Sequence, residues 1–379
     1  MDPLTHTCVG AGLSAAGLRR TTALATPTLI LAANAPDIDI FTSFGAPYLS
    51  LELRRGLTHG VPALLVLPVL VTALVLGWDR WIRRRRRPDA EPTRALPLWA
   101  LATLGVWTHP ALDWLNTYGM RWFLPFDGRW SYGDAVFIMD PWLWLLLVGP
   151  TFLFWSSGVG IRILWALLAL VLSVPVLLAE MVPGWARVLW IAGIGVWILL
   201  RVRHRPGSND AQGIVRLCLL GAGLYLVGMV GQGSMVNSIV VDEAGGSEVV
   251  EALMVGPLPA DPFGAQVVVQ EAETYRTGEF RWNRRPRVDW NDELLTRLEV
   301  TGDSETRAMI ATATEHPEAQ RYLTWARFPI FRIDAGPGPA CQVKLLDARY
   351  VDRGDGNGGG ALSGPRIQVP CPTPPTPTS

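Results

Sequence analysis

The sequence is poor in charge, and Lys344 is its only lysine. Only 17% of the 379 residues are charged, whereas 49% are hydrophobic, a balance that argues against an ordinary soluble protein. The arginines occur in short clusters beside apolar runs and form no broad basic patch, so nucleic-acid binding is not expected. The first hypothesis is therefore a membrane protein in contact with the lipid bilayer.

Several patterns that identify common sites are also missing. The four cysteines include no C-x-x-C pair, so neither a cysteine zinc site nor a redox motif is predicted. The sequence has no glycine-rich phosphate loop, no G-x-S-x-G elbow and no H-E-x-x-H helix. Cys341 and Cys371 both lie in the polar C-terminal part, where they could form a disulfide outside the cytoplasm or stay free.

What is present is a series of apolar segments that extends to about Met235. Several approach the ~20 residues that cross a bilayer. We expect six crossings: Val61–Trp78, Leu96–Trp107, Trp142–Trp155, Ile163–Ala179, Val188–Leu200 and Leu217–Met235. The predicted fold is mainly α: a polytopic helical membrane domain (1–236), a soluble α+β domain (237–369) and a disordered Pro/Thr tail (370–379).

The α+β domain is predicted from turn-rich sequence with short β-type runs. The expected strands are Gln266–Glu271, Phe328–Ile333, Gln342–Val351 and Arg366–Val369, and the expected helices are Glu305–Thr314 and Pro317–Arg327. Asn357–Gly360 is expected to be a flexible loop.

The arginine clusters predict the orientation in the membrane. Arg83–Arg87 follow the first crossing, and further arginines separate the fifth from the sixth, so these loops are expected in the cytoplasm. His59, the loop 127–140 and everything after Met235 then lie outside. The C-terminal domain is therefore expected to be extracytoplasmic, and the inner membrane of a bacterium is the location that the family resemblance described below implies.

The N-terminal apolar stretch is interrupted by Arg19 and Arg20. We interpret it as a hairpin of two short helices, Leu4–Leu18 and Thr22–Ala33, because a single crossing would place His6 on the side opposite His59. The alternative is a cleaved signal peptide, since Ala33-Asn34-Ala35 resembles a cleavage site.

The strongest candidate site is the pair His109 and Asp113. Residues four apart lie on one helix face, and ionisable groups at membrane depth are costly unless they serve a site. Pro110 between them is expected to break the helix. A purely structural Asp–His hydrogen bond is the alternative.

Further candidate ligands precede this pair, namely His6, Asp37, Asp39 and His59. Imidazoles with carboxylates suit Zn²⁺, with Mn²⁺ or Fe as alternatives, and so large a set could hold two ions. Each residue also has an explanation that involves no metal. His6 could be solvated, and Asp37 or Asp39 could initiate a turn. Asp39 could instead orient a ligand, and Thr58 beside His59 could cap the next helix.

Residues after the pair are less specific. Arg121 could bind an anionic substrate group such as phosphate, or could be an interfacial arginine. Asp140 before Pro141 is explained by helix capping, with a role at the site as the weaker alternative. His204 and His316 are not assigned to the site.

These motifs resemble a known family. Met1 to about Leu145 is similar to the membrane-bound metal-dependent hydrolases of the YdjM-like family through Thr5-His6, Pro36-Asp37-Ile38-Asp39, Arg55-Gly56-Leu57-Thr58-His59, His109-Pro-Ala-Leu-Asp113, Asn116-Thr-Tyr-Gly119, Pro125-Phe126 and Asp140-Pro141. Ala326-Arg-Phe-Pro329 and Asp347-Ala-Arg349 resemble an extension of longer members.

The ligand order is further similar to that of zinc-dependent phospholipases C. This resemblance implies His6, Asp37, His59, His109 and Asp113 as metal ligands. Those enzymes carry more histidine ligands downstream, whereas this chain has no histidine between His109 and His204, which favours one or two ions over three.

The expected function is hydrolysis of a phosphodiester or other ester of a lipid-like substrate by a metal-activated water. Asp39 or Asp113 would accept the proton. The alternative from another class is a non-enzymatic scaffold, or a metal-sensing or transport component, with a structural metal site.

Overall fold

The computed structural model describes residues 1–335, 340–351, 362, 364–371 of the chain. The predicted loop Asn357–Gly360 and all but the first two residues of the predicted tail lie outside the described residues. The chain forms two compact units: the first comprises Met1–Ile38, Arg55–Ser234 and Gly256–Gly264, and the second comprises Asp39–Arg54, Met235–Val255 and Ala265–Ser379.

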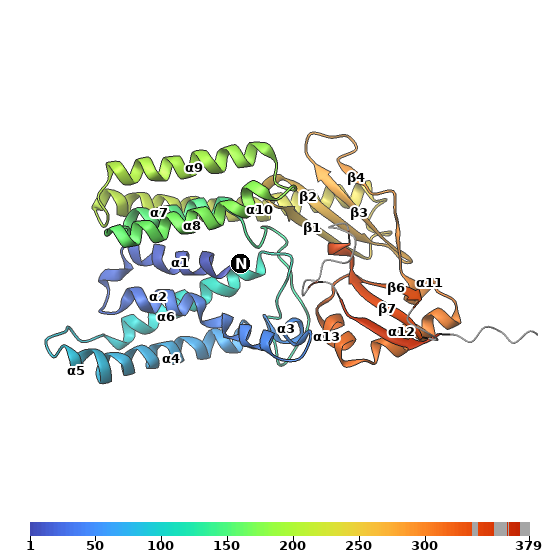
Figure 1. Cartoon of the computed structure of the whole chain (residues 1–379), viewed down its shortest axis with the longest axis horizontal. Coiled ribbons are helices and arrows are strands. Elements are labelled where there is room, and N and C mark those ends of the chain that lie inside the picture. Colours follow the sequence, from blue (N-terminus) through green and yellow to red (C-terminus); the bar gives the residue numbers. More distant parts are fainter. Residues whose placement is uncertain (336–339, 352–361, 363, 372–379) are drawn as a thin grey trace, which may run out of the picture. The chain divides into compact units, whose positions relative to one another are not determined.

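The first unit begins with the helical hairpin expected from the sequence (Figure 1). Helix α1 (Pro3–Ala15) is capped by Asp2, whose side chain accepts from the amide of Thr5, and α2 (Ala25–Asn34) returns beside it. The short 3₁₀ helix η1 (Leu18–Arg20) lies between them. Gly10 allows close packing, because a Cβ there would lie 2.6 Å from the Leu29 carbonyl oxygen.

Helices α4 (Val61–Trp78) and α6 (Ala95–Trp114) pack against α2, with the π-helical turn η3 (Asp79–Arg83) and α5 (Arg84–Arg86) after α4. A small apolar core joins them through Ala32, Val71, Leu98 and Val106. The predicted break at Pro110 is wrong, since α6 continues through it to Trp114. A proline removes only one backbone hydrogen bond, and a helix packed against neighbours tolerates that loss.

The remaining helices of this unit are α7 (Pro141–Trp155), α8 (Val159–Leu178), α9 (Gly184–Arg203) and α10 (Asn209–Glu243). Four helical stretches are long and apolar enough to cross a membrane: Val61–Arg86, Val159–Leu178, Gly184–Arg203 and Asn209–Glu243. Two of the six expected crossings, α6 and α7, are not among the helices that are long and apolar enough to cross a membrane. α7 has only 15 residues, and the last turns of α6 carry His109 and Asp113.

The second unit contains two sheets. One has the strand order β1 (Ala252–Leu258), β2 (Asp261–Gln270), β3 (Thr274–Arg281), β4 (Val288–Trp290), with β5 (Leu295–Thr296) also paired to β3. The other is antiparallel, with the order β6 (Pro329–Ala335), β7 (Ala340–Asp347), β8 (Arg366–Pro370). Helical segments complete the unit: η2 (Ala35–Phe44, shared with the first unit), α3 (Leu49–Leu53), α11 (Leu298–Thr301), α12 (Ser304–Thr314), α13 (Pro317–Trp325) and η4 (Ala348–Tyr350).

The sequence predicted this unit in part. Strands β2, β6, β7 and β8 and helices α12 and α13 are confirmed, with shifts of a few residues at their ends. β1, β3, β4 and β5 were missed, the last two because runs of three and two residues carry no periodic pattern. α10 continues eight residues past the predicted end at Met235, to Glu243. Cys341 and Cys371 form a disulfide with their Cα atoms 4.9 Å apart, which resolves that alternative.

Candidate metal centre

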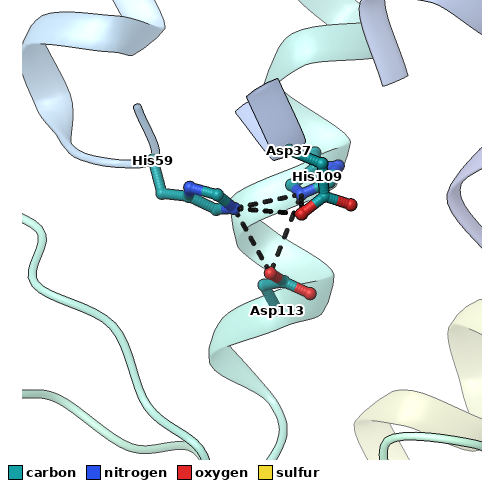
Figure 2. A group of neighbouring side chains, drawn as sticks. All are labelled: Asp37, His59, His109 and Asp113. Carbon is teal, nitrogen blue, oxygen red and sulfur yellow. Dashed lines mark hydrogen bonds and ion pairs between the residues drawn. The ribbon is translucent and has the colours of Figure 1, made fainter. Parts of the chain in front are cut away.

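Four of the predicted ligands converge within the first unit (Figure 2). α6 presents His109 and Asp113 one turn apart on the same face, η2 supplies Asp37, and the loop before α4 supplies His59. His59, His109 and Asp113 are buried, and one ligand atom from each of the four lies within 4.8 Å of all the others.

The distances around the two imidazoles define the centre. His59 Nε2 lies 3.1 Å from His109 Nε2, 3.4 Å from Asp113 Oδ2 and 3.9 Å from Asp37 Oδ1. His109 Nε2 lies 3.7 Å from each of the same two carboxylate oxygens. Around Zn²⁺ with bonds of about 2.0–2.1 Å, tetrahedral ligand atoms stand about 3.3–3.4 Å apart. The distances from His59 to His109 and to Asp113 are close to this spacing, whereas the distances to Asp37 and from His109 to Asp113 are longer, so the four atoms form a looser group than the ligands of a bound ion.

The hydrogen bonds of the two histidines occupy Nδ1 of each ring and leave Nε2 of each facing this centre. His109 Nδ1 lies 2.7 Å from the carbonyl oxygen of Ala33, which can only accept, so neutral His109 carries its proton on Nδ1. Its Nε2 lone pair then faces two carboxylates. His59 Nδ1 lies 2.9 Å from the Thr58 hydroxyl, which leaves Nε2 for the centre. Such bonds to the other ring nitrogen are typical of metal-binding histidines.

This use of Thr58 replaces the predicted one. The N-cap of α4 is Gly60, and no side chain caps that helix. A Cβ at Gly60 would lie 2.8 Å from the Trp122 carbonyl oxygen, and that oxygen accepts from the amide of Val61 at 2.7 Å. The start of α4 is thus held by the segment after α6, which also fixes His59.

His6 lies beside these four. Its ring stacks on His109 with a centroid separation of 3.7 Å, and its Nε2 lies 3.2 Å from Asp113 Oδ1. The Met1 ammonium group contacts the same oxygen. His6 Nδ1 is buried without a hydrogen-bond partner among the described residues. Asp113 thus uses one oxygen toward His6 and the other toward the four-residue centre.

Arg55 is a site residue that sequence reasoning missed. Its Nε lies 2.9 Å from Asp113 Oδ2, one terminal nitrogen lies 2.6 Å from the Asn116 Oδ1, and its guanidinium lies over the Tyr118 ring. Arg55 has a left-handed backbone, with φ at 53°, which strains a non-glycine residue. Its place in the motif 55–59 was the one available signal.

The other candidates have different surroundings. Asp39 belongs to the second unit and pairs with Arg54 at 3.6 Å. Arg121 is buried with its guanidinium 4.8 Å from the Trp130 ring centre. Asp140 caps α7 by accepting from Leu143 and also accepts from the Tyr225 hydroxyl, which confirms its capping interpretation. Roles for Asp39 and Arg121 at the site stay predictions.

His204 and His316 lie outside the centre. His204 pairs with Asp210 at 3.7 Å, and His316 caps α13 by accepting from the amide of Glu318. Both therefore have local partners unrelated to the five candidate ligands.

Comparison with known proteins supports the resemblance seen in the motifs. Residues 1–182 match the model of the YdjM inner membrane protein family, so the predicted resemblance is confirmed over this part of the chain. The family and the four apolar helices indicate a location in a bacterial inner membrane.

The chain is also similar to the uncharacterized protein YfhP of Bacillus subtilis (strain 168), with 26% identity over 124 residues. That match covers 33% of this chain and 35% of YfhP. No solved structure matches the chain.

Proposed function

We propose that this chain, whose residues 1–182 match the YdjM inner membrane protein family, is a membrane-bound metal-dependent hydrolase. The proposal is supported above all by the convergence of Asp37, His59, His109 and Asp113, with a lone pair of His109 aimed at two carboxylates. These four residues would hold Zn²⁺, with Mn²⁺ or Fe as alternatives. The substrate we propose is a phosphodiester or another ester of a lipid-like molecule.

When bound, the ion would supply an acidified water and polarise the phosphoryl or carbonyl oxygen of the ester, so that the phosphorus or carbon atom is open to attack. The chain's own residues would do the rest. Asp113, which borders the four-residue centre, would accept the proton from that water. Arg55 would hold Asp113 in place through its Nε, and Arg121 would bind the anionic group of the substrate. Asp39 stays the alternative proton acceptor.

The orientation is a further part of the proposal. Several arginines gather where the ends of α1, α7 and α9 meet: Arg216 donates to the Ala16 carbonyl, Arg19 lies over the Phe154 ring, and Arg201 donates to Ser156. His6, by contrast, lies near the opposite end of α1, where Trp144 of α7 donates to Asp2. The positive-inside rule then places the arginine end in the cytoplasm and the metal ligands toward the outside.

Metal analysis of the purified full-length protein tests this proposal. We expect His109→Ala and Asp113→Ala to lose bound zinc, while the matched variants His204→Ala and His316→Ala keep the wild-type stoichiometry. Unchanged zinc in both site variants would contradict the metal centre.

Activity is tested next on phospholipids and simple phosphodiesters. We expect turnover by the wild type and none by His109→Ala or Asp113→Ala. Zinc retained without turnover on any ester would instead favour the scaffold alternative.

A further inference from the structure

A second feature of the first unit lies apart from the metal ligands. A cavity of about 410 Å³ lies between α7, α8 and α9, within the range of ~300–1,000 Å³ that is typical of ligand sites. Its walls are apolar and rich in tryptophan, including Trp165 and Trp197. The described residues that line it include none of the candidate metal ligands and no aspartate or glutamate.

The cavity is elongated along α7. Its lining extends from Trp144, in the first turn of α7, to Arg201, whose guanidinium donates to the hydroxyl and carbonyl oxygens of Ser156 just after α7 ends. Twelve residues of helix span about 18 Å. One leaflet of a bilayer core is about 15 Å thick, half of about 30 Å. The residues that line the cavity therefore span about the depth that one lipid acyl chain occupies in the bilayer.

The positive charge in the cavity lining is confined to one end of the cavity. Arg201 lies in the last turn of α9 and Arg162 in the first turn of α8, and both line the cavity. The N-terminus of α8 contributes to the same end, because its cap, Gly158, offers no side-chain hydrogen bond to the first amides. Two guanidinium groups at one end of an apolar cavity complement a phospholipid whose anionic headgroup lies at that end and whose acyl chain extends along the cavity.

We infer that this cavity binds an anionic phospholipid of the bilayer, with the phosphate at Arg162 and Arg201 and one acyl chain along Trp165 and Trp197. This lipid is distinct from a substrate, because its headgroup lies at the end of α7 opposite Trp144, and Trp144 contacts Asp2 beside the metal ligands. The inference does not rest on the proposed hydrolase activity.

The test counts lipids retained by the purified full-length protein, using native mass spectrometry after exchange into detergent with added phosphatidylglycerol or phosphatidylcholine. We expect the wild type to retain phosphatidylglycerol preferentially. Arg162→Ala should bind it about fivefold more weakly, as expected for one arginine at a membrane surface. Arg203→Ala, on the same end of α9 but outside the cavity lining, is the matched control and should bind normally.

A second pair of variants tests the acyl-chain position. Ala166→Trp fills the cavity from α8, whereas Val171→Trp adds the same bulk at a 63% exposed position of α8 that does not line it. We expect lipid loss only from Ala166→Trp. Equal retention of both lipids by the wild type, or unchanged binding in both Arg162→Ala and Ala166→Trp, would overturn the inference.

Discussion

Asp113 in the first unit and Asp347 in the second are both 1% exposed, yet their surroundings differ in kind. Asp347 is surrounded by donors: the Arg349 guanidinium at 2.8 and 2.9 Å and the amides of Arg349 and Arg327 at 3.0 and 2.7 Å. Asp113 also receives donors, the Met1 ammonium group on Oδ1 and Arg55 on Oδ2, but Oδ2 in addition lies 3.7 Å from His109 Nε2. A buried carboxylate among donors is explained by structure, whereas acceptors that converge on one point call for a cation.

This contrast also explains the two C-terminal motifs. Ala326-Arg-Phe-Pro329 and Asp347-Ala-Arg349 meet through the bonds of Asp347 to Arg327 and Phe328, and the amide of Ala348 donates to the Phe328 carbonyl. They form a structural ion pair and its backbone support. The motifs around His59 and His109, by contrast, bring two imidazoles and a carboxylate close to the carboxylate of Asp37.

The largest effect should come from breaking the buried ion pair of Asp347 and Arg349. Asp347→Ala leaves the Arg349 charge buried without its carboxylate, which typically costs about 3–5 kcal/mol. We expect amide hydrogen exchange in β6 and β7 to accelerate strongly in this variant. Asp334→Ala, which removes an exposed acid from β6, is the control and should exchange like the wild type. Unchanged exchange in Asp347→Ala would show that the ion pair is dispensable.

A chelator should affect only the four-residue centre formed by Asp37, His59, His109 and Asp113. An ion present at 100 times its Kd stabilises the folded protein by about 2.7 kcal/mol, and removing it removes that gain. The thermal midpoint of the wild type should therefore fall on chelation and recover when zinc is restored. His109→Ala should give the same midpoint with and without chelator, whereas a chelator effect that persists in this variant would place the ion elsewhere.

A smaller effect is expected from Thr58→Val, which removes the partner of His59 Nδ1 while keeping the side-chain shape. Loss of such a supporting bond typically weakens metal binding about 10- to 100-fold. Zinc affinity can be measured by competition with a chromogenic chelator. Thr103→Val removes a hydroxyl that bonds to the Trp99 carbonyl in an exposed part of α6, and it should leave the affinity unchanged. Equal affinities in both variants would argue against His59 as a ligand.

Much of the candidate centre followed from local sequence. The spacing of His109 and Asp113 fixes them on one face of any helix, and the arginines after α1 predict a chain reversal that returns Asp37 to the end where His6 begins. These are short-range geometric consequences, so they could be predicted without the fold.

What could not be predicted depends on contacts between distant segments. Arg55 reaches Asp113 because its own left-handed backbone turns the chain. The amide of Arg121 donates to the carbonyl oxygen of Arg55 and holds this turn. The break expected at Pro110 is absent because neighbouring helices support α6. β3 was missed because its buried residues, Tyr275, Thr277, Gly278 and Phe280, do not follow the strict alternation of a strand. Tertiary packing decides each of these cases.

The smallest effect is expected from mild acid, which should affect the centre that contains Asp113 but not the ion pair of Asp347. Metal binding needs neutral imidazoles, so the zinc affinity should weaken as the pH falls. Burial alone would raise the pKa of Asp347, but Arg349 and the backbone donors hold this pKa below its ordinary value of 3.8. A lowered folded pKa adds stability that is fully present above 3.8 and is lost as the pH falls through the folded value.

Between pH 7 and 5 we therefore expect bound zinc to fall while hydrogen exchange in β6 and β7, corrected for its intrinsic pH dependence, stays constant. Zinc content and exchange measured on the same samples check this. If both changed together, the donors around Asp347 would not make that carboxylate independent of pH in this range, and the distinction between the two clusters would fail.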